Sequence, residues 1–270
     1  MTNPQTSSPI LPHRTRRAPP ADIPVRNSIL AALLASEYKR LLPRLEHVSL
    51  KRGEIVYRAD QDIEAVYFPE EAVVAMVDTT GDGRTIEVGI IGGEGLVGIN
   101  IFLGGVVTPD KAIVQLPGSA MRMKSKDLRK EARFGSPLQR LLLEYTRTFL
   151  AVISQSVACS QHHNIEQRVA RWLLTMNDYA GSREFLMVHE SIAAMLGVRR
   201  VGITETARKL QAAGLISYRR GRISVLDKPG LRKKSCECYR FIRQQYEGLH
   251  GELPRLLSRA DVPRRTPRAT

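Results

Sequence analysis

Two groups of arginine residues have the spacing expected of side chains that contact nucleic acid. Arg199 and Arg200 open a predicted helix that runs to about Ala213. Apolar residues recur on one face of this helix at i, i+4 and i+7, and the cationic residues fall elsewhere; the apolar positions are Ile203, Ala207 and Leu210. A guanidinium group can donate two hydrogen bonds to a guanine or to a phosphate. The helix therefore combines a buried face with an outer face that suits a polyanion.

A second, shorter helix is predicted immediately before the first, over Glu190–Leu196. Its apolar positions Ile192, Ala193 and Leu196 share one face. Gly197 follows, and glycine enters the left-handed conformation of a tight turn at little cost. Two short helices that share an apolar core across such a turn meet the mechanical requirement of a helix-turn-helix, whose second helix enters the DNA major groove. The alternative is an ordinary helical hairpin with its arginines on a solvated face.

A predicted β-hairpin with an arginine-rich tip follows the second helix. Ala213-Gly214 is a helix stop, and two short β-prone runs then flank the residues Arg219, Arg220, Gly221 and Arg222. A cationic hairpin beside a recognition helix is typical of a winged helix-turn-helix, with the wing on phosphates. Residues 183–234 contain twelve Lys or Arg and four Asp or Glu. This surplus of positive charge favours polyanion binding through counterion release.

Over the same residues the sequence resembles the C-terminal domain of Crp/Fnr-type bacterial transcription regulators. The resemblance is dense over residues 188–200 and 210–223. It implies a homodimer that binds double-stranded DNA and contacts RNA polymerase, with Arg200 in the place of the family's base-contacting arginine. Where family members often carry a glutamate and then an arginine, this chain has Val201 and Glu205, so its operator is expected to differ from the best-known one. The residues predicted to contact DNA are Arg199, Arg200, Gly202, Glu205, Arg208, Lys209, Arg219, Arg220 and Arg222.

Short β-prone runs, punctuated by glycines, occupy residues 48 to about 124. Gly81-Asp82-Gly83 between two of these runs is a hairpin signal. Many short strands at regular spacing indicate a closed or double-layered β-fold. The family resemblance extends over this region and implies a jelly-roll β-barrel of the cyclic-nucleotide-binding type. The predicted fold class is therefore α+β: this barrel, a long dimerisation helix and a C-terminal winged helix-turn-helix.

The resemblance also implies where such a barrel would hold an effector. A pocket is predicted from Gly93, Glu94, Gly95 and Lys111, because glycines let backbone amides approach a phosphate and a carboxylate can hold a ribose hydroxyl. Members that bind cyclic nucleotides place an arginine where this chain has Asp110, and an anion there repels the cyclic phosphate. Lys111 is a poorer substitute because it lacks the planar fork of arginine. We therefore predict no cofactor, with a cyclic nucleotide as the disfavoured alternative.

A long helix is predicted over residues 136–160, and Ser136-Pro137 is a good helix start. Its residues alternate four and three positions apart in a heptad seam, which is typical of paired helices. The predicted dimerisation residues are Leu138, Leu142, Tyr145, Phe149 and Val152. The alternative is a helix packed on its own barrel, and Leu141, Leu150 and Ile153 widen the apolar stripe enough for both.

These elements divide the chain into five predicted segments. They are a disordered arm (1–25), a cyclic-nucleotide-binding-like β-barrel domain (26–135), the dimerisation helix (136–160), a winged helix-turn-helix domain (161–250) and a basic tail (251–270). Further helices are expected over residues 27–45, 164–180 and 230–249.

Other residues with chemical potential give weaker signals. Cys159, His162 and His163 lie close together at a helix end but lack the matched second pair of a zinc site, so we predict a hinge and no metal. Cys236 and Cys238 are a weak redox candidate and are expected to pack on a terminal helix. Three cysteines make no disulfide framework, which indicates a reduced, cytoplasmic protein. The sequence contains no nucleophile elbow, P-loop or HExxH motif, so no enzyme is predicted.

The net charge of +14 over 270 residues also favours a polyanionic partner. No apolar run approaches the roughly 18 residues of a membrane helix, so no membrane association is predicted. The sequence therefore predicts a sequence-specific, homodimeric transcription regulator that is not gated by cyclic AMP. Two alternatives stay open: a cyclic-nucleotide-responsive regulator and a non-specific DNA-compacting protein.

Overall fold

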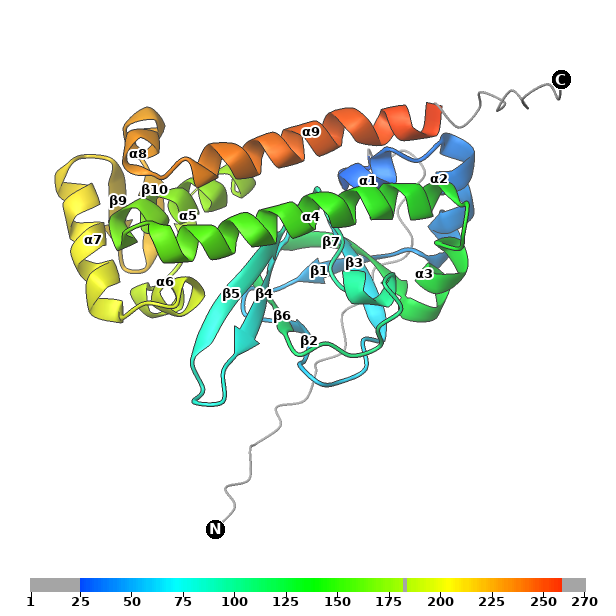
Figure 1. The fold of residues 1–270 in the computed structure, drawn as a ribbon, viewed down its shortest axis with the longest axis horizontal. Coiled ribbons are helices and arrows are strands. Elements are labelled where there is room, and N and C mark those ends of the chain that lie inside the picture. Colours follow the sequence, from blue (N-terminus) through cyan, green and yellow to red (C-terminus); the bar gives the residue numbers. More distant parts are fainter. Residues whose placement is uncertain (1–24, 182–183, 259–270) are drawn as a thin grey trace, which may run out of the picture.

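The computed structural model describes residues 25–181 and 184–258. Figure 1 shows a long helix, α4 (Pro137–His162), running across a set of β-strands, with helix α9 (Cys238–Ser258) beside it and the remaining C-terminal helices gathered at one end. The predicted arm (1–25) lies outside the described residues except for Val25. Residues 251–258, predicted as the start of a basic tail, continue helix α9, and the rest of that tail lies outside the described residues.

Two antiparallel sheets form the N-terminal barrel. Their strand orders are β1-β7-β3 and β2-β6-β4-β5. The apolar core between them holds Val66, Phe68 and Val74, each almost completely buried. The strands are β1 (Glu46–Leu50), β2 (Ile55–Tyr57), β3 (Ala65–Pro69), β4 (Val73–Thr79), β5 (Thr85–Ile91), β6 (Lys111–Leu116) and β7 (Gly118–Lys124), with the short helices η2 (Ile99–Ile101) and α3 (Ser125–Glu131).

Three short helices replace the single helix predicted over residues 27–45. They are α1 (Ser28–Ala31), α2 (Ala35–Leu41) and the 3-10 helix η1 (Leu42–Arg44). The backbone of Leu34 is extended, with ψ 148°, so the helix cannot continue through it. The buried Asn27 side chain accepts hydrogen bonds from Ile29 N and Leu30 N and begins the first helix.

Strand β7, the central strand of its sheet, lies at the end of the region predicted to be β-prone. The Pro117-Gly118 pair predicts only a turn. Gly118 is required there, because a Cβ atom at this position would collide with the backbone of Glu71 and Ala72. The turn is therefore immediately followed by a strand that pairs on both sides.

Helix α4 buries the predicted dimer seam inside its own chain. Leu138, Leu142, Tyr145, Phe149 and Val152 are at most 6% exposed. Phe149, for example, packs over Gly89 of β5, where a Cβ atom would come within 2.9 Å of its ring. The prediction that these five residues pair two subunits therefore needs correction: they pack on the protomer's own barrel. The apolar residues that α4 leaves exposed are Leu143, Leu150 and Val157.

The C-terminal helix predicted over residues 230–249 is broken in two. Helix α8 (Lys228–Lys234) ends at Ser235, whose extended backbone (ψ 160°) turns the chain before α9 begins at Cys238. Helix α9 then lies along α4 (Figure 1), and Leu249 and Leu253 join the barrel core.

The C-terminal domain surrounds Trp172, which is completely buried. Helix α5 (Ile165–Tyr179) begins with a capping box formed by Asn164 and Gln167, and matches the helix predicted over residues 164–180. The other elements of the C-terminal domain are β8 (Phe185–Leu186), α6 (His189–Leu196), α7 (Arg200–Ala212), β9 (Ile216–Arg219) and β10 (Arg222–Val225). The three strands form a sheet in the order β8-β10-β9. None of the helices in the described residues is long and apolar enough to cross a membrane.

Candidate nucleic-acid interface

Helices α6 and α7 form the predicted helix-turn-helix. Gly197 ends α6 with φ 62° and ψ 39°, the left-handed conformation expected of a tight turn. The inner faces of the two helices are buried against one another and against α5; the buried residues include Ile192, Ala193, Leu196, Ile203, Ala207 and Leu210. This shared core fixes α7 rigidly while its opposite face stays open.

The first turn of α7 presents two arginines. Arg199 is its N-cap residue, and Arg200 follows with 68% of its side chain exposed. Arg200 Nε lies 3.7 Å from Glu190 Oε2, and both side chains are open to solvent. An exposed ion pair of this kind contributes at most about 1 kcal/mol, so it can be exchanged for a stronger partner. Further along the helix, Glu205, Arg208 and Lys209 are also exposed.

Gly202 does not belong to this outer face, which corrects its prediction as a DNA contact. A Cβ atom on Gly202 would lie 2.6 Å from Ile165 Cδ1, so the residue faces α5. Its lack of a side chain lets α7 approach α5 closely. Val201, with 67% of its surface exposed, is the outward-facing residue of this turn.

The wing is the hairpin of β9 and β10. Its two central residues, Arg220 (φ 48°) and Gly221 (φ 79°), both have positive φ, as a type I′ turn requires. Arg219, Arg220 and Arg222 are exposed at or beside this tip, as predicted from the sequence. Arg222 Nη1 donates a hydrogen bond to Glu184 Oε1, just before β8, at 2.8 Å. The other two guanidinium groups sit on the tip itself.

His189 and Tyr218 connect the wing to the helices. Their rings stack with centroids 4.3 Å apart, and His189 Nδ1 lies 3.0 Å from Thr204 Oγ1 of α7. Burial, and then the positive charge of Arg200, lower the pKa of His189. The histidine therefore acts as a neutral spacer that holds wing and recognition helix at a fixed separation.

The predicted effector residues of the barrel are turned toward protein rather than toward a shared pocket. The Glu94 carboxylate accepts hydrogen bonds from Gly92 N (3.0 Å) and Tyr179 Oη (2.8 Å), and burial raises its pKa. A Cβ atom on Gly95 would meet Tyr145 Oη at 2.5 Å. Two tyrosines, from α4 and α5, therefore occupy the space beside the glycine-rich turn.

Gly93 and Lys111, the other predicted effector residues, also have structural roles. Gly93 O accepts a hydrogen bond from Ser28 N of α1, and Lys111 begins β6 opposite Val77. Asp110 is buried and accepts hydrogen bonds from Tyr57 Oη (2.7 Å) and from Thr108. The carboxylate that the sequence places opposite a cyclic phosphate is thus held inside the barrel by two hydroxyl groups.

Residues 47–133 match the cyclic nucleotide-binding domain family, and residues 167–234 match the Crp-like helix-turn-helix domain family. Together these matches span more than half of the chain. The chain belongs to the Crp/Fnr family. No curated protein matches it in sequence.

Solved structures of Crp/Fnr-family regulators share this architecture. FixK2 from Bradyrhizobium japonicum is 19% identical, with a TM-score of 0.61 over 71% of this chain and 98% of that one. A transcriptional regulator of the Crp/Fnr family from Eubacterium rectale is also 19% identical, with a TM-score of 0.61 over 74% and 94% of the two chains. A CRP-family transcriptional regulator from Thermus thermophilus is 22% identical, with a TM-score of 0.60 over 69% and 95%. The predicted α+β fold, with its barrel and helix-turn-helix, is confirmed.

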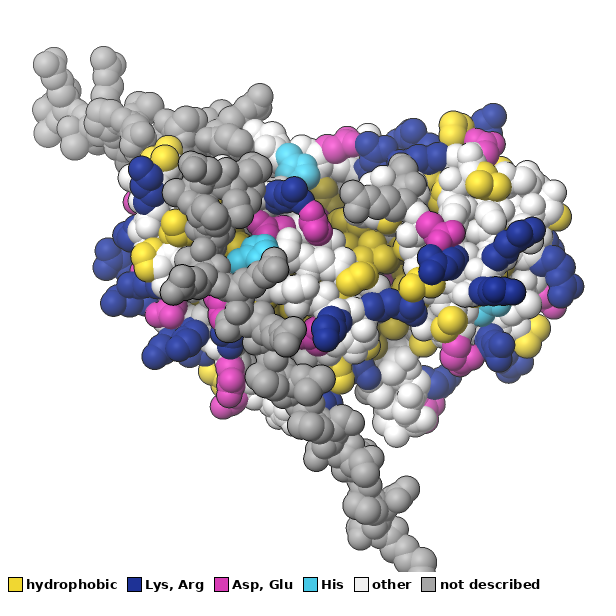
Figure 2. Space-filling view, turned by 180° about the vertical axis from the view of Figure 1, so that it is seen from behind, with side chains coloured by type: hydrophobic (Ala, Val, Ile, Leu, Met, Phe, Trp, Pro, Cys, Tyr) yellow, Lys and Arg dark blue, Asp and Glu magenta, His cyan; other side chains and the backbone are white. Residues whose placement is uncertain are grey.

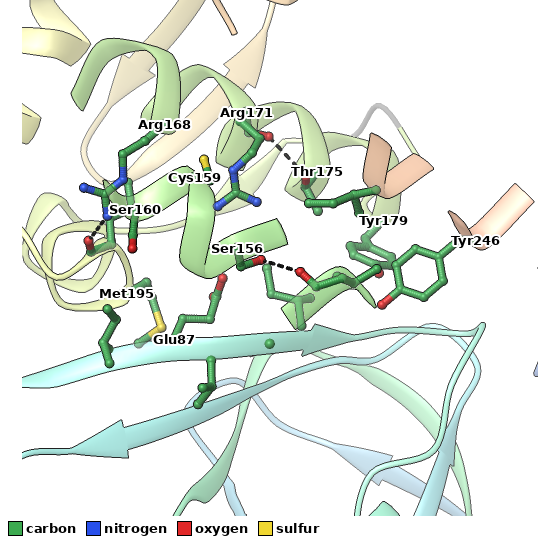
Figure 3. Close-up of a pocket in the computed structure, with 17 residues that line it drawn as sticks. Glu87, Ser156, Cys159, Ser160, Arg168, Arg171, Thr175, Tyr179, Met195 and Tyr246 are labelled. Carbon is green, nitrogen blue, oxygen red and sulfur yellow. Dashed lines mark hydrogen bonds between the residues drawn. The ribbon is translucent and has the colours of Figure 1, made fainter. Parts of the chain in front are cut away.

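In this Crp/Fnr-type chain a cavity lies between the barrel and the DNA-binding domain (Figure 3). Glu87 of β5 and Arg171 of α5 point into it from opposite walls, and Trp172 Nε1 lies 3.3 Å from Glu87 Oε2. Burial raises the pKa of Glu87 to about 7, outweighing the positive charge of Arg171. Neither residue was predicted from the sequence, in which each is a charged residue between two apolar ones: Ile86 and Val88 flank Glu87, and Ala170 and Trp172 flank Arg171.

We expect Glu87 to make stability fall as the pH rises. The unfolded glutamate titrates near its ordinary pKa, so between about pH 4.5 and about pH 7 the folded chain binds more protons than the unfolded chain. The free energy of unfolding should therefore decrease by about 1–3 kcal/mol across this window, and Glu87→Gln should lack that component. Urea denaturation at successive pH values measures it, with the exposed Glu64→Gln as control. Parallel pH profiles for wild type and Glu87→Gln would contradict the assignment.

Proposed function

We propose that this Crp/Fnr-family chain regulates transcription by binding specific double-stranded DNA as a homodimer, without a requirement for cyclic AMP. The observation that carries the proposal is the exposed guanidinium group of Arg200 in the first turn of α7, beside an arginine-tipped wing. The first turn of a recognition helix is the part that reaches base edges in the major groove. RNA polymerase is the partner that family membership supports.

The exposed residues divide into base readers and phosphate contacts. Arg200 suits a guanine, because its fork donates to both O6 and N7. Glu205, one helical turn further on, suits the amino group of a cytosine. The remaining cations suit phosphates, which position the protein without reading sequence; they are Arg199, Arg208, Lys209, Arg219, Arg220 and Arg222. The wing and the helix would thus contact the backbone on either side of the base pairs that are read.

The subunits would pair through the exposed side of α4. Leu143, Leu150 and Val157 recur every seven residues and are 52%, 58% and 58% exposed. We call these three residues the α4 outer stripe. A seven-residue apolar repeat on a solvent-facing helix is the pattern of a two-stranded coiled coil. Two-fold pairing along it would present the recognition helices to half-sites about 34 Å apart.

Independence from cyclic AMP is supported by the barrel interior. Asp110 carries its charge into the region where family members that bind cyclic nucleotides place an arginine, and Tyr57 and Thr108 hold it there. Tyr145 and Tyr179 fill the space beside the glycine-rich turn. A nucleotide would have to displace these side chains and leave Asp110 facing its phosphate.

Selection of bound sequences from a random DNA library, at near-physiological salt and with or without cyclic AMP, tests the proposal. The expected result is a two-fold symmetric motif recovered equally under both conditions. A motif that requires cyclic AMP would overturn the proposed independence. Equal affinity for all sequences would favour a non-specific DNA-compacting protein. That second candidate is supported by the net charge of +14 and by Lys and Arg side chains at both ends of the molecule (Figure 2).

Replacing Arg200 by Ala should relax specificity at one base pair of each half-site. Loss of a bidentate contact costs about 1–3 kcal/mol at the preferred base, so operator affinity should fall by about 5- to 150-fold for each half-site, while affinity for random DNA changes little. Arg220→Ala should instead weaken binding to all sequences and reduce the slope of log K against log salt by about 0.9 for each subunit bound. Fluorescence anisotropy over a series of operator variants and salt concentrations distinguishes the two effects.

The control is Arg133→Ala, an exposed arginine in the segment between α3 and α4, at the opposite end of α4 from the helix-turn-helix (Figure 1). It should bind DNA as the wild type does. Uniform weakening by Arg200→Ala on every sequence would make Arg200 a phosphate contact and would leave base reading to other residues.

Replacing Leu150 by Glu should dissociate the dimer. A carboxylate in the centre of the α4 outer stripe would be buried without a partner on pairing, so the dimer dissociation constant should rise by at least about 100-fold. Sedimentation equilibrium measures it, and circular dichroism should show an unchanged fold because the side chain is exposed in the protomer. Leu103→Glu, at a site 57% exposed on the barrel, is the matched control. A dimer that survives Leu150→Glu would place the interface elsewhere.

A further inference from the structure

Three cysteines and a histidine from distant parts of the sequence meet where α4 and α9 come together. Cys159 and His163 are at the C-terminal end of α4, Cys236 is in the link before α9, and Cys238 begins α9. Their sulfur atoms and a ring nitrogen all lie within 4.8 Å of one another, and the three cysteines are at most 3% exposed. We propose that this cluster, the Cys3His site, binds one Zn²⁺ ion.

The distances within the cluster suit a single tetrahedral ion. With Zn–S bonds of about 2.3 Å and a Zn–N bond of about 2.0–2.1 Å, a tetrahedron requires about 3.8 Å between sulfurs and about 3.5 Å from sulfur to nitrogen. Cys159 Sγ lies 3.6 Å from Cys236 Sγ, and Cys238 Sγ lies 3.6 Å from His163 Nδ1. A disulfide needs about 2.05 Å. An iron–sulfur cluster, with its own iron and sulfide atoms between the ligands, needs a larger space than this.

The surrounding side chains orient the ligands as they do in zinc sites. His163 Nε2 lies 3.1 Å from Glu237 Oε1, which leaves Nδ1 directed at the sulfurs. A carboxylate behind the histidine fixes its ring and tautomer and raises its basicity toward a metal. Gln155 Nε2 donates to Cys238 Sγ at 3.1 Å. Each of these contacts orients a proposed ligand and leaves the space between the four ligand atoms free for the ion.

The charge of the site is also balanced. Three thiolates and a neutral imidazole around Zn²⁺ carry one net negative charge, and the buried guanidinium of Arg171 supplies a positive one nearby. Thiols that still carry a proton would release it to solvent when the ion binds.

A bound ion would join the end of α4 to the start of α9 beside α5, at the boundary of the DNA-binding domain. The helix break at Ser235 makes this possible, because it lets Cys236 and Cys238 point back toward α4. The missing second pair of ligands, on which the sequence-based rejection of a metal rested, is therefore Cys236 and Cys238. The signal available in the sequence was that the three cysteines of the chain, with one histidine, could supply the four ligands of a metal ion.

The first test measures metal content in the full-length chain purified without chelator. Mass spectrometry of metals should find about one zinc per chain, with no iron, no acid-labile sulfide and no visible colour. His163→Gln and Cys236→Ser should lose most of this zinc. The matched control is His162→Gln, an exposed histidine one position earlier, which should keep it.

A second test does not depend on the folding of cysteine variants. The wild-type chain is stripped with a chelator and titrated with Co²⁺, which should give the visible spectrum of a tetrahedral thiolate complex and be displaced by Zn²⁺. Glu237→Gln, in the link before α9, should weaken zinc binding by about 10- to 100-fold, whereas Glu247→Gln, on α9 itself, should not. The proposal is overturned by a chain that takes up neither ion, by equal zinc in His163→Gln and His162→Gln, or by iron with sulfide in place of zinc.

Discussion

Burial of one face of α4 against the barrel and α9 is the constraint on which the rest of the molecule depends. Tyr145 and Phe149 lie in the barrel core, while the C-terminal end of the same helix reaches the DNA-binding domain and carries Cys159. Because an α-helix of 26 residues is a stiff rod about 39 Å long, it transmits the position of one end to the other. The face left over, the α4 outer stripe, is then the surface available for a second subunit.

The fold could be predicted from the sequence wherever the signal is local. The turn at Gly197, the I′ hairpin at Arg220-Gly221 and the cap at Ser136 each follow from a few adjacent residues. Helix α4 illustrates what local signals leave out. A heptad repeat states that one face is buried but does not name the partner, and here the partner is the chain's own barrel. Strand β7 and the break at Ser235 were likewise decided by contacts with distant segments.

The candidate site also contains residues that local patterns predict and residues that are brought together only by contacts between distant segments. Arg200 could be predicted because helical periodicity turns it outward, and the wing arginines because they flank a hairpin turn. Gly202 has the right position in the sequence and the wrong face, as its contact with Ile165 shows. The cysteine cluster could not be found by spacing, because its two halves are joined only when α9 folds back along α4. Glu94 was predicted to line an effector pocket, and the partner that its carboxylate has in the structure, Tyr179, comes from the other domain.

The DNA-binding domain is packed tightly on the barrel, and this restricts how any signal could reach the recognition helix. Val73, Ile90 and Leu116 of the barrel share one apolar cluster with Trp172, and a Cβ atom on Gly197 would contact Ile86 at 3.1 Å. Moving the DNA-binding domain relative to the barrel would expose this cluster, at a cost of about 25 cal/mol per Å² of apolar surface. The boundary between the barrel and the DNA-binding domain is less tightly packed where the polar residues Glu87 and Arg171 face a cavity. A ligand or a proton acting there would change the boundary directly. Tyr179 lines this cavity and donates a hydrogen bond to Glu94, so one side chain joins the boundary between the domains to the glycine-rich turn.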